Sequence, residues 1–352
     1  MKNSMFTWIA DLALVLVGVS CADSPVVITA TGAPYEVLVV MDGQQWEAPA
    51  GRALFDALDR DVDGLPQSEP SFDISQCEEE GFDGMMRRVR NIVICDISDI
   101  YTAPKLKYAR DVWSKGQMVL KIQAPDELSF ELFVAQYYEK IAPFFTKVEL
   151  NRSIDYLNKT YNTAANAAVD SLFGGVQLHL MTDVDQMKKG EDFLWVSNNS
   201  GTGRRDAVIY SFPYTDPATF TLEYMINKRD SVMKINVPGA FENSYMSTER
   251  RFAPTYTAMS LGGRYVAEVR GLWRMEGDLM GGPFVQHAIL DEAAQRVIVA
   301  EIFVFAPERE KRNLVRLMEA SLYTLRLADD QNDENTVDLA IEEEESEQGP
   351  NQ

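Results

Sequence analysis

Residues 117–141, QMVLKIQAPDELSFELFVAQYYEKI, decide how the chain is organised. The apolar and β-branched residues of the first part predict a strand over 117–125. Pro125, Asp126 and Glu127 follow, and a proline with acidic residues suits the first turn of a helix. Helical spacing of apolar residues continues from there, so the stretch predicts a strand that leads directly into a helix.

The same order returns in residues 296–323, RVIVAEIFVFAPEREKRNLVRLMEASLY. An apolar run is again followed by Ala-Pro and an acid, and then by a helical pattern from Glu308 to about Leu327. We therefore predict an α+β protein of two related strand-plus-helix units with mixed or mainly antiparallel sheets, and with a possible internal duplication. A chance likeness between two ordinary strand–helix units explains the echo equally well.

Other periodic stretches set the boundaries of the two units. The first half adds strands over 36–42 and 90–97, a helix over 52–62, and a helical region that ends at Gly174, where a glycine cap fits. The second half is richer in strands, predicted over 176–181, 192–197, 207–212, 263–273, 283–290 and 296–306. We expect an N-terminal unit over 35–175 and a C-terminal unit over 176–328.

Length and charge narrow the class of protein. A chain of 352 residues with 46% hydrophobic residues is long enough for two folded domains. The net charge of −21 disfavours binding to nucleic acid, because an acidic surface repels phosphate. Ten acidic residues and no Lys or Arg lie between 329 and 352. This composition predicts a disordered acidic tail over 329–352, with a partner-binding tail as the alternative.

The N-terminal segment has the layout of a secretory signal peptide. Lys2 precedes an apolar stretch over 12–19, and Ser20 stands before Cys21. A small residue before a cysteine resembles the bacterial lipobox, although Gly18 stands where a Leu-like residue is usual and Asp11 interrupts the apolar region. We expect a signal peptide over 1–20, lipid attachment at Cys21 and a tether over 21–34, so that the protein is held on a membrane of the bacterial cell envelope, in the periplasm or on the surface. A plain N-terminal helix and a soluble-secretion signal are the alternatives.

Two further cysteines, Cys77 and Cys95, remain if Cys21 carries lipid. They are too few for a disulfide framework, and no CxxC pair suggests zinc or redox chemistry. A buried free thiol is the simpler interpretation of Cys95 in its apolar run. A disulfide between the two is left open as the alternative, because an oxidising compartment would permit it.

A calcium loop is the first candidate for chemistry. DRDVDG at 59–64 resembles the start of an EF-hand loop, in which Asp59, Asp61 and Asp63 would supply oxygen ligands. The twelfth position, which needs a bidentate glutamate, is Pro70, and Glu69 falls one place early. The stretch is therefore a weak calcium candidate, a polar turn after a helix is the alternative, and no metal or cofactor is expected.

GRYVAEVRGLWRMEGDLMGGPF at 263–284 is the second candidate. Arginine and tryptophan are favoured in binding hot spots, and the stretch also carries acids. The candidate binding surface consists of Arg264, Arg270, Trp273, Arg274, Glu276 and Asp278. A β-hairpin with core aromatics is the alternative. Carboxylates such as Glu268 could in principle serve acid–base chemistry, but no spacing pairs them.

The pieces EVLVVMD, LPQSEPSFD, RNIVICDI and LWRMEGDLMGGPF, with the cysteine-terminated signal, resemble an uncharacterised family of Bacteroides-type lipoproteins, domain-of-unknown-function family 4837. The resemblance covers about residues 34 to 327. It implies a cell-envelope location and supplies no activity, cofactor or catalytic residue.

These observations lead to two hypotheses of different class. The first is a cell-envelope lipoprotein that is not an enzyme and serves as a binding or assembly module, with an envelope protein or a small ligand as partner. The second is an envelope hydrolase that uses carboxylates, which would need a deep cleft lined by facing acids with displaced pKa values.

Overall fold

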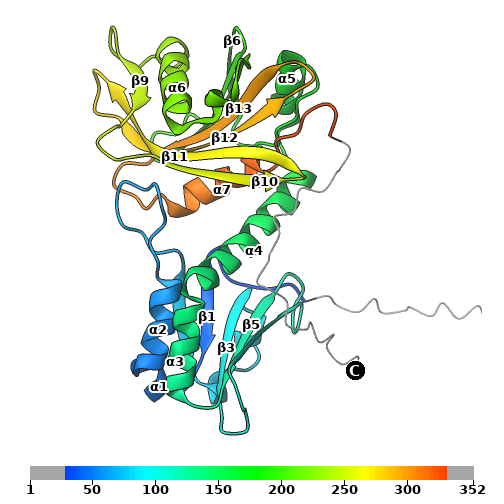
Figure 1. Ribbon diagram of the computed structural model, residues 1–352, viewed down its shortest axis with the longest axis vertical. Coiled ribbons are helices and arrows are strands. Elements are labelled where there is room, and N and C mark those ends of the chain that lie inside the picture. The colour runs from blue at the N-terminus through cyan, green and yellow to red at the C-terminus, as the bar shows by residue number, and fades with distance from the viewer. Residues whose placement is uncertain (1–27, 331–352) are drawn as a thin grey trace, which may run out of the picture.

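The computed structural model describes residues 28–330, and in this range two sheets are connected by a long slanting helix (Figure 1). The predicted signal peptide over 1–20, Cys21 and the tail beyond residue 330 lie outside the described residues. Within the predicted tether, Thr29 and Thr31 form isolated bridges to Lys115 and Val89.

The first sheet is mainly parallel. Its strands are β1 (Glu36–Val40), β2 (Asp73–Cys77), β3 (Asn91–Ile97), β4 (Lys105–Arg110) and β5 (Met118–Ala124), in the order β2-β1-β3-β5-β4, with β4 antiparallel to β5. One face packs on α1 (Gly43–Glu47), α2 (Pro49–Leu58), α3 (Glu127–Gln136) and the first half of α4 (Tyr138–Lys159). The short 3₁₀ helices Glu79–Gly81 and Met86–Arg88 follow β2. The strands and the helix predicted in this half are confirmed.

The second sheet has eight antiparallel strands. They are β6 (Gln186–Gly190), β7 (Phe193–Ser197), β8 (Arg204–Pro213), β9 (Tyr245–Thr248), β10 (Thr255–Leu261), β11 (Arg264–Glu276), β12 (Gly281–Asp291) and β13 (Arg296–Phe305), in the order β10-β11-β12-β13-β8-β7-β6, with β9 beside β11. α5 (Thr163–Phe173) and α7 (Arg312–Leu322) cover one face, and α6 (Leu222–Asn236), preceded by the 3₁₀ helix Pro217–Phe220, covers the other. Because both faces are covered, β12 and β13 are almost continuously buried.

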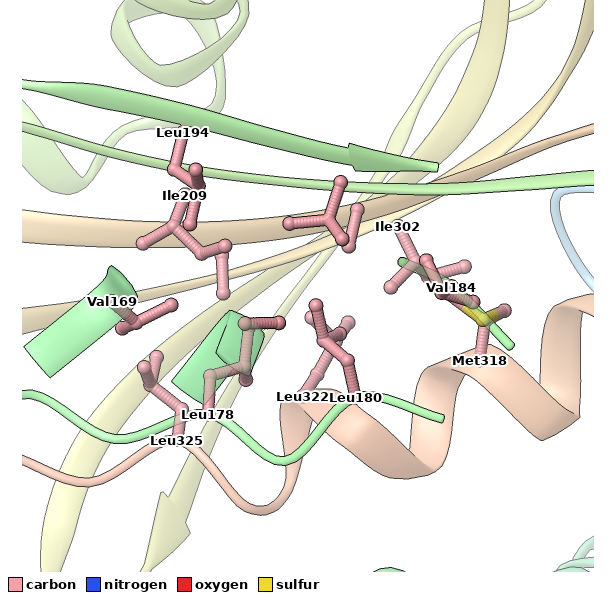
Figure 2. Close-up of a cluster of buried hydrophobic side chains, with 14 of the residues drawn as sticks. Val169, Leu178, Leu180, Val184, Leu194, Ile209, Ile302, Met318, Leu322 and Leu325 are labelled. Atoms are coloured by element: carbon pink, nitrogen blue, oxygen red, sulfur yellow. The ribbon is translucent and has the colours of Figure 1, made fainter. Parts of the chain in front are cut away.

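The core under this sheet contains a segment that sequence periodicity placed in a strand. Residues 176–181, VQLHLM, form one isolated bridge, between Gln177 and Arg326, instead of joining the sheet. Leu178 and Leu180 point into the core between the sheet and α7 (Figure 2). The prediction of a strand here is wrong, because an extended apolar segment that forms its own layer has the same alternation as a sheet strand.

The α+β class is confirmed, with mixed and antiparallel sheets. The structure does not show a duplication. Both strand–helix pairs exist, but β5 lies in a mainly parallel five-stranded sheet and β13 in an antiparallel eight-stranded one. The echo between the two sequences therefore extends to local order only.

α4 is shared by both units. Its first half buries apolar residues against the first sheet, and its second half packs Leu150, Ile154 and Leu157 on Ala320 and Tyr323 of the α7 region. This arrangement follows from an apolar stripe that continues along the whole helix.

A buried carboxylate joins the two units more directly. Glu69, in the segment between α2 and β2, accepts hydrogen bonds from the backbone N–H of Lys311 (2.9 and 2.8 Å) and of Arg312 (2.7 Å). Lys311 is the N-cap of α7 and makes no side-chain cap of its own. Arg312 in turn donates to the carbonyl of Pro70 (2.6 Å) and to Asp73 (2.7 Å). In Figure 1 this blue segment rises from the first unit to the start of α7. The first unit thus caps a helix of the second, which satisfies N–H groups that the helix cannot satisfy itself.

We predict that Glu69→Gln lowers the free energy of unfolding by about 1.5–3 kcal/mol, because the charge-assisted bonds to the helix end are lost in a buried site. Urea denaturation measures the change. Glu80→Gln, at an exposed position, is the control and should stay within about 0.5 kcal/mol of wild type. Equal effects of the two substitutions would contradict the cap.

Candidate functional site

A cavity of about 640 Å³ lies where the two units meet. Its walls come from the segment after α2, from the middle of α4 and from the turn between β10 and β11. Its floor is formed by Ser71, Arg270, Arg316, Glu319 and Tyr323. The cavity therefore needs residues from both halves of the chain.

The floor depends on one face of α7. Arg312, Arg316, Glu319 and Tyr323 recur at helical spacing and so lie on the same side of the helix, toward the first unit. Met318 points the other way, into the core under the second sheet (Figure 2). α7 therefore has two buried faces, one apolar and one charged.

The charges on the floor form a network with β11 and β12. Arg270 donates to both oxygens of Glu268 (2.7 and 3.0 Å) and pairs with Glu319 on α7. Nε2 of His287 lies 3.1 Å from Glu268 Oε2. Burial opposes the ionisation of Glu268, but the Arg270 guanidinium and the contact with His287 outweigh it and lower the pKa of Glu268 to about 2. Glu268 therefore remains a carboxylate at any physiological pH.

Arg316 is held differently from Arg270. It donates to the carbonyl of Ser71 (2.7 Å) and more weakly to the hydroxyl of that residue (3.4 Å), and its guanidinium lies over the ring of Tyr35, 4.3 Å from the centroid. Burial lowers the pKa of Arg316 below its usual value, because the charged form is removed from water. Its partners are thus a carbonyl, a hydroxyl and the aromatic rings of Tyr35 and Phe72.

We predict that Glu268→Gln destabilises the protein by on the order of 3 kcal/mol at pH 7. The folded-state pKa of Glu268, about 2, lies below the ordinary value of 4.5. Its stabilising contribution is therefore fully present above about pH 4.5 and is lost as the pH falls toward 2. Urea denaturation of both proteins from pH 7 to pH 3.5 should show the difference shrinking below pH 4.5. Glu292→Gln, at an exposed turn, is the control, and a difference that does not change with pH would contradict the assignment.

The six residues predicted as one binding surface are not brought together. Arg270 reaches the cavity floor, whereas Trp273 is buried on the opposite face of the sheet and donates to the carbonyl of Val304 (3.2 Å). Of the others, only Arg274 and Glu276 lie together, 3.4 Å apart. Arg264 pairs with Asp329 and Asp330, and Asp278 accepts from the N–H of Leu279 (2.6 Å) in the β11–β12 turn.

Gly282 of this stretch is explained by close packing. A Cβ on Gly282 would lie 2.0 Å from the Val304 oxygen and 3.2 Å from the Trp273 indole nitrogen. Only glycine fits there, because the indole and the neighbouring strand approach the backbone closely.

The three acids of the calcium candidate have different surroundings and do not form one site. Asp61 and Asp63 are at the cavity mouth, and Asp61 accepts a hydrogen bond from Ser68 (2.6 Å). Asp59 ends α2, and burial, followed by the neighbouring acids, raises its pKa. Within residues 28–330, no group of three or more His, Cys, Asp or Glu is arranged to hold a metal ion. Glu69, one place short of the calcium loop, serves as the cap of α7 instead.

Cys77 and Cys95 are free thiols in the structure. Burial raises the pKa of both. Neither thiol is therefore activated as a nucleophile.

A smaller hollow of about 270 Å³ lies on the α6 side of the second sheet, lined by Trp195, Trp273 and Phe303. Its buried acid, Asp206, accepts from the Trp195 indole (2.9 Å) and from Arg204 Nε (3.1 Å). Arg204 already pairs with the acid of this hollow, so Asp206 is not available to a ligand. This hollow is therefore a weaker candidate for a binding site than the cavity between the units.

Sequence reasoning missed Arg316, Glu319 and Tyr323. A signal was present, since polar residues at helical spacing run along α7. Such a stripe ordinarily marks a solvated face, but here residues 69–73, Arg270 and the second half of α4 bury it.

Comparison with protein families divides the chain in nearly the same way as the structure. Residues 162–324 match the family described as Domain of unknown function (DUF4837), and residues 30–158 match the family described as Domain of unknown function (DUF8532). The chain thus combines matches to two domains of unknown function. The DUF4837 family is the one named by the resemblance, but its match covers the second part of the chain and not the expected range from about residue 34 to 327. α5, which sequence reasoning placed in the N-terminal unit, lies within the DUF4837 match and packs on the second sheet.

A search of curated proteins finds no match. In the part of the chain that the structure describes, no helix is both long enough and apolar enough to span a membrane.

Proposed function

We propose that this protein is a non-enzymatic binding module of the bacterial cell envelope, anchored by lipid at Cys21, and that the cavity between its two units is the binding site. The observation that carries the proposal is the cavity itself. Ligand sites are concave, mostly apolar and equipped with a few placed polar groups, and they occur preferentially between domains. Leu150, Met259 and Leu261 supply apolar wall, and the α7 charges supply the polar floor.

The geometry favours binding over hydrolysis. A carboxylate hydrolase needs a general acid with a raised pKa in the cleft. The pKa of Glu268 is displaced downward, and its oxygens are occupied by Arg270 and His287. Glu319 is likewise bound by Arg270. These acids act as fixed partners of a guanidinium, which is a structural and electrostatic role.

The anchor at Cys21 is supported by the signal-like segment that precedes it and by the small residue before the cysteine. Covalent acyl chains would hold the protein on the membrane, since each buried methylene contributes about 0.8 kcal/mol. The protein is strongly acidic, so basic patches could not hold it on an anionic membrane in place of the lipid anchor.

We predict that a tryptophan placed in the cavity abolishes ligand binding. Ligand-observed NMR with a library of small organic fragments should find binders of the wild-type protein, and Thr146→Trp, on the α4 wall, should lose them. Tyr156→Trp is the matched control on the same helix, since Tyr156 is exposed. Binders that persist in Thr146→Trp, or a library without binders, would refute the cavity as a binding site.

We predict that cells grown with a labelled fatty acid incorporate label into the wild-type protein and into Cys77→Ala, but not into Cys21→Ala. Only Cys21 lies at the end of a signal-like segment. Equal label in all three proteins would exclude lipid attachment at Cys21.

A further inference from the structure

We infer that the cavity binds a small carboxylate with an apolar body, and that Arg316 holds its carboxylate. This inference rests on the proposed function, because it concerns the ligand of the same site. It follows from the way in which the three arginines around α7 are partnered.

The buried arginines differ in their ion pairs. Arg270 is clamped by Glu268 and Glu319, and Arg312 pairs with Asp73 (2.7 Å). Among the residues that the structure describes, Arg316 pairs with no carboxylate, although it is 6% exposed. A guanidinium has five N–H donors, and the two bonds to Ser71 leave donors for a ligand. A planar carboxylate is the partner that an arginine binds best, through two parallel hydrogen bonds.

The charges around Arg316 agree with an anionic ligand. Glu319 favours the charge of Arg316 from one turn along α7, but Arg270 already binds the carboxylate of Glu319. Lys147 adds a further cation on the α4 wall. The acids Asp61 and Asp63 lie at the exposed mouth, where water screens them, so they oppose a carboxylate bound at Arg316 only weakly.

The walls define the remainder of the ligand. Ala142, Pro143 and Leu150 of α4 line the cavity together with Met259 and Leu261 of β10. Apolar surface from both elements suits a hydrocarbon or aromatic body, and a volume of about 640 Å³ is in the range of small-molecule sites.

Isothermal titration calorimetry of the full chain tests the inference with two acid–amide pairs, 2-naphthoate with 2-naphthamide and decanoate with decanamide. We expect each carboxylate to bind at least about 10-fold more tightly than its amide. Arg316→Gln should weaken the carboxylates by about 10-fold or more and leave the amides unchanged. Arg251→Gln removes an exposed positive charge outside the cavity, where Arg251 pairs with Glu249 (2.7 Å), and should change either affinity by less than about 3-fold.

The comparison of acid with amide uses the wild-type protein, so it stands even if Arg316→Gln does not fold. Arg316→Lys is the second variant, since it keeps the charge but loses the planar fork, and it should bind the carboxylates less tightly than wild type. Amides that bind as tightly as acids, with both lost in Thr146→Trp, would overturn the inference and leave the proposed function standing. The absence of binding by all four probes would overturn the inference, and the fragment screen then decides the proposed function separately.

Discussion

The placement of the Glu69 carboxylate at the start of α7 is the interaction on which the rest of the structure depends. It brings a segment of the first unit against the amide groups of Lys311 and Arg312 and satisfies donors that the helix leaves open. Arg312 and Arg316 then bind the backbone of the same segment, at Pro70 and Ser71. These contacts bury the charged face of α7 and turn it into the floor of the cavity between the units.

The charges buried at this face are stabilised by pairing with one another. Arg270 of β11 lies between Glu268 and Glu319, so every charge of this trio has a direct partner. The arrangement requires both the sheet and the helix to be in place, because removing one partner leaves a buried charge uncompensated. A fixed network of this kind suits recognition of a ligand better than proton transfer, since the low pKa of Glu268 keeps it ionised.

The sequence predicted the parts of this fold that local patterns encode. Apart from residues 176–181, the predicted apolar strands are present, and so are the helix start after Pro125 and the glycine cap at Gly174. Short polar strands such as β2, β4 and β6 were not predicted, because they form strands through pairing with their neighbours and not through a pattern of their own. The cavity was not predicted for a related reason. The sequence marked Arg270, but the floor also requires α7 and Ser71, which are far apart along the chain and meet through the contacts of Glu69, Arg312 and Arg316. The prediction of lipid attachment at Cys21 rests on a local sequence motif, and the labelling experiment tests it directly.

Native-state hydrogen exchange in increasing urea tests most directly whether this contact makes the two units one folding unit. Exchange of the β3 amides reports on the first sheet, and exchange of the β13 amides reports on the second. If α4 and the capped end of α7 hold the units together, both sets of amides become exchangeable in one cooperative transition with the same urea dependence. A first sheet that opens at clearly lower urea while β13 stays protected would contradict the account.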